Sequence, residues 1–212
     1  LTEVFGQQFM AVKNDRNMLD FSDLEHYMLQ LLADFSEDEQ GQMQVKPTFA
    51  ADELSEFYEE VVCDEYQDSN QVQELILSLL SRERKGQYNR FMVGDVKQSI
   101  YRWRNSDWSL LNEGVQSLFR PSQYSERSMN MNYRSCACIV EFNNRIFGEA
   151  ARLLQQKLER EIEESALVEG SFDVKIEKAY ADIGQRVADS NLLRSGHVSV
   201  TMWESDKKED FY

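Results

Sequence analysis

The stretch "VVCDEYQDSNQVQELILSLL", residues 61–80, runs from an apolar segment directly into a group of acidic and amide side chains. The residues VVC predict a strand. The residues after the acidic group have the apolar spacing of an amphipathic helix that is entered at Ser69 or Asn70. A polar turn between a strand and a helix explains such a group, and so does a site that holds a metal ion and activates a water. The local residues alone favour the turn.

A second apolar segment, "RFMVGD", predicts another buried strand that ends in Gly94 and Asp95. Strands that alternate with helices indicate a parallel α/β sheet, and functional groups in such sheets lie just beyond the carboxyl ends of the strands. Both predicted strands end in carboxylates there. Asp64 at a strand tip suits Mg²⁺ held by few protein ligands, and Glu65 beside it can orient or deprotonate a water, as in phosphate-hydrolysing enzymes.

The remaining elements follow from apolar periodicity and turn residues. A helix is expected over residues 19–35, with Ser22 as its N-cap and Glu25 three residues further on. Residues 36–47 are polar and predict a loop. We further expect a short helix or an approach segment to the strand over 51–60 and helices over 107–119 and 138–164. A short strand and loop are expected over 124–135, and a strand over 196–205. The apolar stripe of the longest helix comprises Phe142, Ile146, Phe147, Leu153, Leu154 and Leu158.

Composition is that of a globular protein, with 42% hydrophobic and 29% charged residues among 212. No apolar run approaches the roughly 20 residues that a membrane span needs. The start, "LTEVFGQQF", does not have the pattern of a signal peptide. The cysteines are three, an odd and scattered set, which favours a reducing, cytoplasmic setting.

The net charge of −15 is unevenly distributed. Residues 15–68 hold 16 Asp or Glu and 2 Lys or Arg, whereas residues 82–104 hold 7 basic and 2 acidic side chains. An acidic protein can bind phosphates through one local positive surface, so the net charge does not exclude a nucleic-acid partner.

Two further segments carry chemistry-bearing residues at close spacing. In "GDVKQSIYRWR", residues 94–104, Gln98 can reach a phosphate, while Tyr101 and Trp103 alternate with arginines, as in platforms that stack nucleobases beside a phosphate contact. Core aromatic residues are the alternative. In "NMNYRSC", residues 130–136, Tyr133 can stack on a base while Arg134 reaches a phosphate.

Together, in this order and spacing, these segments resemble the UvrD/Rep group of superfamily 1 DNA helicases. "VVCDEYQDSNQVQELIL" resembles helicase motif II, "VGDVKQSIYRWR" motif III and "NYRS" motif IV. "LDFSDLE" resembles the segment before motif II, and "GDVKQSIYRWRNSDW" with "FNNRIF" is most similar to AddA/RecB-type helicase–nuclease subunits. The clear resemblance covers residues 19–148.

The resemblance implies a RecA-like parallel sheet of the P-loop NTPase type, incomplete and flanked by helices, with a mainly helical C-terminal part. Residues 1–128 would be the later portion of the first RecA-like lobe, and residues 129–212 the start of the second. The implied ligands are ATP, Mg²⁺ and single-stranded or duplex DNA. A further partner would be a second subunit of a helicase–nuclease, and no membrane is implied.

The resemblance also implies a role for each site residue. Asp64 and Glu65 would hold Mg²⁺, and Glu65 would also be the catalytic base. Gln98 would sense the γ-phosphate of ATP, Tyr133 would stack on adenine, and Arg134 would contact the γ-phosphate. The single-stranded DNA path would be lined by Tyr101, Trp103 and Arg104.

The phosphate-cradling loop of this group, G-x-x-x-x-G-K-[ST], does not occur in the 212 residues. We therefore expect an internal piece of a helicase that is inactive, or nearly so, when isolated. Two alternatives remain: a non-catalytic homologue that binds DNA or a partner, and a metal-dependent nuclease that uses Asp64, Glu65 and Asp68. The nuclease ranks last because it gives no role to Gln98, Tyr133 and Arg134.

Overall fold

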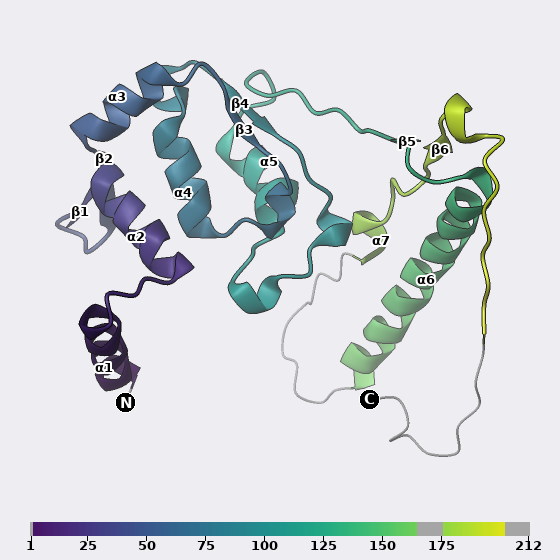
Figure 1. Cartoon of the computed structure of the whole chain (residues 1–212), viewed down its shortest axis with the longest axis horizontal. Helices are drawn as coiled ribbons and strands as arrows, with labels where there is room; N and C mark the ends of the chain where they lie inside the picture. The colour runs from purple at the N-terminus through teal and green to yellow at the C-terminus, as the bar shows by residue number, and fades with distance from the viewer. Residues whose placement is uncertain (1, 165–175, 202–212) are drawn as a thin grey trace. The chain divides into compact units, whose positions relative to one another are not determined.

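The computed structural model describes residues 2–164 and 176–201 (Figure 1). The chain forms two compact units, Leu1–Ser125 and Glu126–Tyr212. Each unit combines helices with short sheets, so the chain has a mixed α/β fold. The division into helicase lobes at residues 1–128 and 129–212 stays a prediction.

The strands predicted around the acidic group pair with each other. β3 (Val61–Cys63) and β4 (Arg90–Met92) form a parallel two-stranded sheet in which Val62 lies opposite Phe91. Hydrogen bonding continues past both strands, because the Val93 amide donates to the Cys63 carbonyl and the Tyr66 amide donates to the Val93 carbonyl, each at 2.9 Å. The predicted parallel pairing is therefore confirmed for these two strands.

The prediction that these strands are buried is wrong. Val62 is 63% exposed and Phe91 is 60% exposed. Successive side chains of a strand point to opposite faces, and residues opposite each other in register share a face. Val62 and Phe91 thus form an apolar face that the other described residues leave open.

The helix after the acidic group agrees with the prediction. α4 (Gln71–Leu80) begins after Asn70, whose side-chain oxygen accepts from the Gln73 amide at 2.8 Å. The Gln73 side-chain oxygen in turn accepts a hydrogen bond from the Asn70 amide, which completes a capping box. This cap fixes the point at which the polar turn becomes helix.

The helix predicted over residues 19–35 is shorter and is capped by a different residue. α2 runs from Phe21 to Leu32, and Asp20, rather than Ser22, is its N-cap in a capping box with Asp23. Lys13, near the end of α1 (Thr2–Asp15), places its Nζ 2.6 Å from Asp23 Oδ1. The carboxylate of Asp20 accepts the Asp23 amide, so the N-cap lies two residues before the expected one and the helix starts at Phe21.

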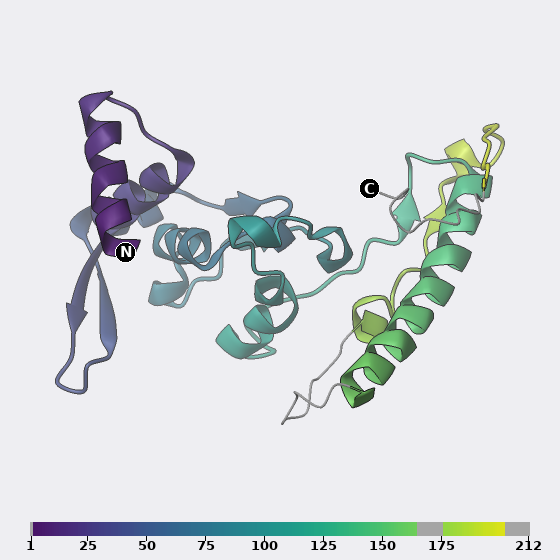
Figure 2. The same cartoon turned by 90° about the horizontal axis from the view of Figure 1, so that it is seen from below.

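Residues 36–47, predicted as a loop, belong to an antiparallel hairpin. β1 (Ala33–Glu37) pairs with β2 (Met43–Pro47), and Figure 2 shows this hairpin extending beyond the helices of its unit. Asp38 Oδ1 accepts the amides of Gln40 and Gln42 at 2.9 and 2.8 Å, and Gly41 has a φ of 77°. The side chain of Asp38 and the left-handed glycine stabilise the turn, which polar composition alone does not predict.

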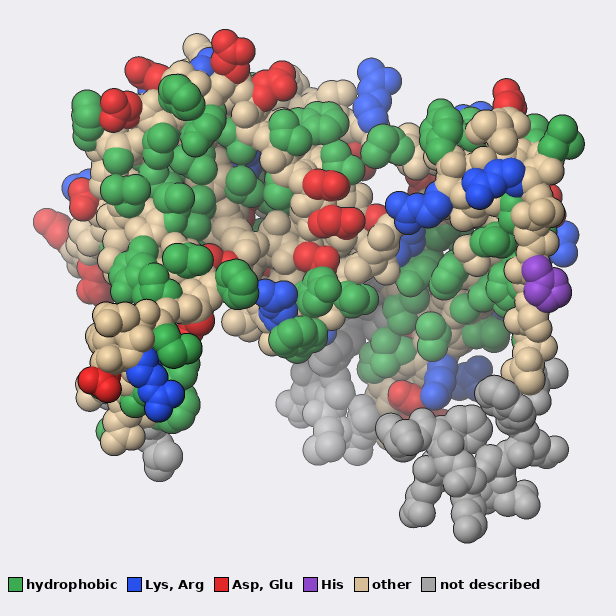
Figure 3. Space-filling view, viewed as in Figure 1, with side chains coloured by type: hydrophobic (Ala, Val, Ile, Leu, Met, Phe, Trp, Pro, Cys, Tyr) green, Lys and Arg blue, Asp and Glu red, His purple; other side chains and the backbone are tan. Residues whose placement is uncertain are grey.

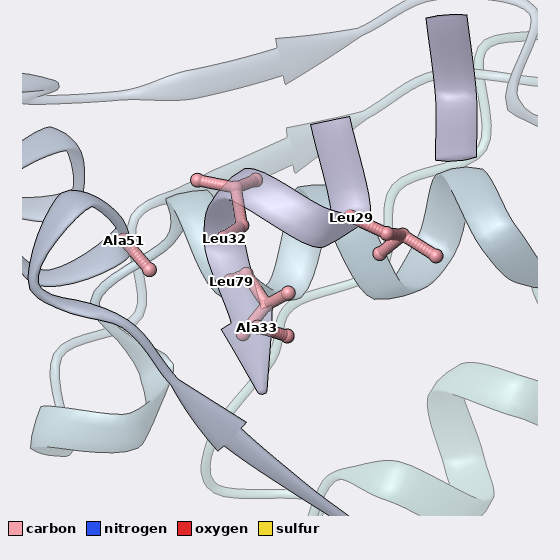
Figure 4. Close-up of a cluster of buried hydrophobic side chains, with 5 residues drawn as sticks. All are labelled: Leu29, Leu32, Ala33, Ala51 and Leu79. Atoms are coloured by element: carbon pink, nitrogen blue, oxygen red, sulfur yellow. The ribbon is translucent and has the colours of Figure 1, made fainter. Parts of the chain in front are cut away.

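A small apolar cluster joins three helices of the first unit. Figure 4 shows its buried side chains, contributed by α2, the start of β1, α3 (Phe49–Phe57) and α4. Leu32 is fully buried, and partly buried aliphatic residues of α3 and α4 pack against the cluster. The cluster consists of Leu29, Leu32, Ala33, Ala51 and Leu79.

A buried polar network anchors β4. The Arg90 guanidinium contacts both Glu74 carboxylate oxygens at 2.9 Å and also bonds Glu83. The Tyr66 hydroxyl donates to Glu74, and burial together with this bond raises the pKa of Tyr66, so its proton stays in place. Bidentate guanidinium–carboxylate pairs are among the stronger polar contacts in proteins, so the network fixes β4 against α4.

The rest of the first unit consists of short helical segments. The helix predicted over residues 107–119 is present as a π-helical turn that continues into α5. Single 3₁₀ turns occur at Tyr66–Asp68, Glu83–Lys85, Val96–Gln98 and Arg102–Arg104, and the later segments are Leu110–Gly114 and α5 (Val115–Leu118). Figure 3 shows hydrophobic side chains gathered over the part of this unit that contains α2 and α3.

The second unit is built on the predicted long helix. α6 runs from Ala137 to Glu164, and a parallel pair of short strands, β5 (Met131–Asn132) and β6 (Arg186–Val187), lies near its start. α7 (Ile176–Ala179) and a 3₁₀ turn at Asp189–Asn191 complete the described part. Most of the predicted apolar stripe is exposed, while α6 buries Val140, Ala151 and Gln155.

The strand predicted over residues 196–205 is not formed in residues 196–201, which pair with none of the described strands. Residues 202–205 lie outside the described part. Within the described ranges, no helix has the length and apolar character to cross a membrane.

The Arg90 network yields a stability prediction. Replacing Arg90 by Met leaves the buried Glu74 carboxylate unpaired, so Arg90→Met should lower the free energy of unfolding by about 3 kcal/mol. Urea unfolding followed by circular dichroism measures this loss. Lys85→Met, which removes only the exposed pair with Glu56, should cost less than about 0.5 kcal/mol. Equal effects of the two variants would contradict the assignment of Arg90 as the anchor.

Candidate active site

Asp64 and Glu65 lie at the carboxyl end of β3, and both are exposed. The Glu65 amide donates to Asp64 Oδ1 at 2.9 Å. Glu65 has a left-handed backbone, with φ of 53° and ψ of 39°. Such a conformation costs a non-glycine residue on the order of 1–2 kcal/mol and often occurs at functional positions.

Gln67 lies behind this pair and links it to the next strand. Its side chain is buried, with the residue 1% exposed. Nε2 donates to Glu65 Oε2 at 2.7 Å, and Oε1 accepts from the Asp95 amide at 3.0 Å. A β-carbon on Gly94 would lie 2.7 Å from that Oε1 and 2.9 Å from Leu111 Cδ2, so a glycine is required for this close approach.

The segment after β4 places Asp95 and Gln98 in one turn. Asp95 Oδ2 accepts from Gln98 Nε2 at 3.1 Å, and Asp95 Oδ1 lies 2.6 Å from Lys97 Nζ. Burial by itself would raise the pKa of Asp95, but the hydrogen bonds from Lys97 and Gln98 outweigh it and lower that pKa. Asp95 is therefore a stable anion that orients the amide of Gln98.

Tyr101 and Trp103 are not core aromatics. Trp103 is 77% exposed, and the two rings meet edge to face with centroids 6.1 Å apart. The Arg104 guanidinium lies 5.6 Å from both ring centroids. Exposed rings with a cation over them form a surface suited to flat, negatively charged partners.

Tyr133 and Arg134 belong to the second unit, between β5 and α6. Tyr133 is 74% exposed, and its carbonyl accepts from Asn191 Nδ2 at 2.6 Å. The Arg134 carbonyl accepts from Arg194 Nη1 at 3.2 Å. Asn132 Oδ1 accepts the Arg134 and Ser135 amides at 2.9 and 2.8 Å, which turns the chain toward α6.

The structure thus joins Glu65 to Gln98 by hydrogen bonds within the first unit. Sequence analysis did not identify Gln67 as the link, although an amide between the carboxylates of "DEYQD" was visible. It also gave no role to Asn191 and Arg194. Their contacts with Tyr133 and Arg134 join residues about 60 positions apart in the chain, and no local pattern predicts such contacts. The roles of the site residues remain predictions.

The donor set at β3 fits Mg²⁺. Carboxylate oxygens are hard ligands, and Mg²⁺ commonly binds one or two of them together with phosphate oxygens and waters. The described residues contain no group of three or more His, Cys, Asp or Glu that could hold a metal ion, so Mg²⁺ here would need such additional ligands. Asp68 therefore does not form a three-carboxylate metal site with Asp64 and Glu65. Its Oδ1 is buried and has no hydrogen-bond partner among the described residues.

Comparison with known proteins gives a consistent result. The family description "UvrD/REP helicase N-terminal domain" matches residues 2–118. The A subunit of the ATP-dependent helicase/nuclease of Desulfitobacterium hafniense is 42% identical over 156 residues, covering 69% of this chain and 10% of that protein.

The corresponding proteins of two other organisms match more of the chain. That of Clostridium beijerinckii is 36% identical, covering 97% of this chain and 16% of that protein. That of Oceanobacillus iheyensis is 38% identical, covering 92% and 14%. The chain therefore spans only 10–16% of the length of these relatives.

The lowered pKa of Asp95 predicts a pH-dependent contribution to stability. Because the pKa falls on folding, the contribution is present above the unfolded-state pKa of about 3.9 and is lost as pH falls through the folded-state value. Asp95→Asn should lower the free energy of unfolding by on the order of 1 kcal/mol at pH 7. At pH 3, the difference from the wild type should be smaller. Denaturant unfolding at both pH values checks this, and a pH-independent difference would contradict it.

Proposed function

Because this chain belongs to the UvrD/REP helicase family, we propose that it supplies part of the ATP-hydrolysing and DNA-contacting surface of an ATP-dependent DNA helicase. The observation that carries the proposal is the hydrogen-bonded series Glu65–Gln67–Asp95–Gln98, which leads along the chain to an exposed aromatic pair. One polar centre and one stacking surface are thereby connected within a short stretch of protein.

In this proposal, Glu65 is the base that accepts a proton from the water attacking the γ-phosphate of ATP. Its carboxylate is exposed and has one oxygen held by Gln67. Asp64, whose Oδ1 accepts the Glu65 amide, would hold Mg²⁺ with Glu65 close by. Mg²⁺ would neutralise charge on the phosphates when bound. Gln98 senses the γ-phosphate while Asp95 orients its amide.

Tyr133 and Arg134, in the second unit, are the other residues to which the proposal assigns nucleotide contacts. Tyr133 stacks on adenine through its exposed ring, and Arg134 contacts the γ-phosphate. The hydrogen bonds from Asn191 and Arg194 to their carbonyls support these roles, because they fix the backbone while leaving both side chains at the surface.

Tyr101, Trp103 and Arg104 form the single-stranded DNA surface. Base stacking on aromatic rings does not require a given base, and a guanidinium over the rings can turn to a phosphate. The basic balance of residues 82–104 supports a phosphate partner for this part of an otherwise acidic chain. Cycles of ATP binding and hydrolysis would then move DNA past these rings.

At the level of architecture, we propose that β3 and β4 are two strands of a larger RecA-like sheet. Their parallel pairing and the exposed Val62–Phe91 face support this, because a parallel sheet is normally covered on both faces. Residues 1–128 would then be part of the first helicase lobe and residues 129–212 the start of the second.

For the parent protein, we propose a cytoplasmic helicase–nuclease subunit in DNA repair or recombination that works on single-stranded and duplex DNA beside a partner subunit. The relatives, whose names describe them as A subunits of ATP-dependent helicase/nucleases, support this assignment. We expect the 212 residues alone to be inactive, since they contain no phosphate-cradling loop sequence. A non-catalytic DNA- or partner-binding homologue is the alternative.

Substitution of the proposed base tests the function. In the full-length parent protein, Glu65→Gln should lower kcat for DNA-stimulated ATP hydrolysis by about 100-fold or more, because a carboxamide cannot take the proton. The KM for ATP should stay within about threefold, since Glu65 acts mainly in the chemical step. Steady-state phosphate release measures both. A wild-type parent without ATPase activity would instead favour the non-catalytic alternative.

The DNA surface has its own test. Trp103→Ala should weaken binding of a labelled single-stranded oligonucleotide by about 1–3 kcal/mol, the contribution of one base–aromatic stack. Fluorescence anisotropy measures this loss at a fixed salt concentration. Phe49→Ala is the matched control, because Phe49 is also an exposed aromatic of the first unit but lies on α3. Similar losses for both variants would argue against a stacking role for Trp103.

A further inference from the structure

The buried side chain of Gln67 lies between Glu65, the proposed base, and Asp95, which begins the segment with the proposed DNA-contacting rings. A buried amide is costly unless both its ends are hydrogen-bonded, and here both ends are. One end serves the Glu65 carboxylate and the other serves the Asp95 backbone. Gln67 itself is too deeply buried to contact a substrate, so any effect it has on hydrolysis acts through its neighbours.

The chemistry of these two bonds suits glutamine. The Glu65 carboxylate requires a donor, whereas the Asp95 amide requires an acceptor. A side-chain amide offers both at once, an ionised carboxylate only accepts, and an apolar side chain of similar length does neither. Gly94 adds a steric requirement, because any β-carbon there would press on Gln67 Oε1.

At one end, Gln67 selects the orientation of the proposed base. The Glu65 carboxylate is exposed, and among the described residues Gln67 Nε2 is its side-chain hydrogen-bond donor. An exposed carboxylate otherwise samples several rotamers. The backbone of Glu65 is in the left-handed conformation. The bond from Gln67 therefore restricts the side-chain rotamers of Glu65 and with them the position of its carboxylate.

At the other end, Gln67 is hydrogen-bonded to the start of the segment that carries Tyr101 and Trp103, so its position depends on the position of that segment. The Asp95 amide that bonds Gln67 belongs to the residue whose carboxylate holds Lys97 and Gln98. Asp95 caps the turn Val96–Gln98, and the turn Arg102–Arg104 with its exposed rings follows. A displacement of this segment by bound DNA would change the bond between Asp95 and Gln67.

We propose that Gln67 is a positioning residue that couples DNA on the 95–104 segment to the orientation of Glu65. DNA stimulates ATP hydrolysis through this coupling, which regulates the catalytic base rather than the affinity for nucleotide. The inference rests on the proposed function, because it assigns hydrolysis to Glu65 and DNA contact to the aromatic pair.

The test compares ATP hydrolysis by the full-length parent protein with and without single-stranded DNA. Gln67→Met keeps the length of the side chain and removes both bonds. We expect the ratio of DNA-stimulated to basal kcat to fall at least about tenfold, while KM for ATP and Kd for DNA stay within about threefold. A ratio within about twofold of the wild type would overturn the proposal.

Gln73→Met is the matched control, since Gln73 also bridges two segments through its amide. Its Nε2 donates to Glu25 Oε1 at 2.7 Å and its Oε1 accepts the Asn70 amide, but neither bond reaches Glu65. We expect lowered thermal stability with an unchanged stimulation ratio. An equal fall of the ratio in both variants would reduce the role of Gln67 to general stability and overturn the proposal.

Two further variants separate positioning from folding. Gly94→Ala retains Gln67 but displaces its Oε1, and it should reproduce the loss of stimulation even if Gln67→Met does not fold. In the Glu65→Gln background, Gln67→Met should cause no additional loss of kcat, because it acts only through that carboxylate. Additive losses, or normal stimulation of Gly94→Ala, would count against the coupling.

The outcomes also distinguish this inference from the function on which it rests. If Glu65→Gln abolishes hydrolysis but Gln67→Met keeps the stimulation ratio, the helicase assignment stands and the coupling fails. If the wild-type parent hydrolyses no ATP, or Glu65→Gln is as active as the wild type, the proposed function itself fails.

Discussion

The parallel register of β3 and β4 is the constraint on which the rest of the first unit depends. Val61 pairs with Arg90 and Cys63 with Met92, and the bonds beyond them join Tyr66 and Val93. This register brings the chain after both strands to the same edge, where Glu65 and Asp95 are near enough for one glutamine to bridge them. A shift of this pairing by one residue would turn the side chains of one strand to the opposite face.

The sheet is too small to hold this register by hydrogen bonds alone, since isolated two-stranded sheets are marginally stable. Contacts between side chains provide the rest of the stability that this register needs. Arg90, at the start of β4, is bound on two sides by Glu74 and Glu83, and Tyr66 reaches the same Glu74 from the turn after β3. Both strands are therefore tied to α4 through one carboxylate, and the polar edge is supported by a buried polar network rather than by a large apolar core.

Local signals predicted the elements that their own residues determine. Asn70 as one of the two expected helix entries, the apolar spacing of α4 and α6, and the apolar segment of β3 each indicated the correct element. Prediction failed where a side-chain hydrogen bond that the pattern does not show determines the structure. Asp38 accepts two amides and so stabilises a hairpin turn in a stretch predicted as a loop. Asp20, rather than Ser22, is the N-cap of α2.

The same division applies to the site. Residue types and spacing indicate Asp64, Glu65 and Gln98 as candidate residues whose roles stay predictions, whereas the contact of Gln67 with Asp95 cannot be predicted from spacing. The left-handed backbone of Glu65 has an evolutionary consequence. Glycine or asparagine would adopt that conformation with less strain, so stability alone favours replacing Glu65. Under the proposed role of Glu65 as the base, selection for its carboxylate would retain a glutamate there against this tendency. The identity of this residue would then report whether the proposed reaction is retained.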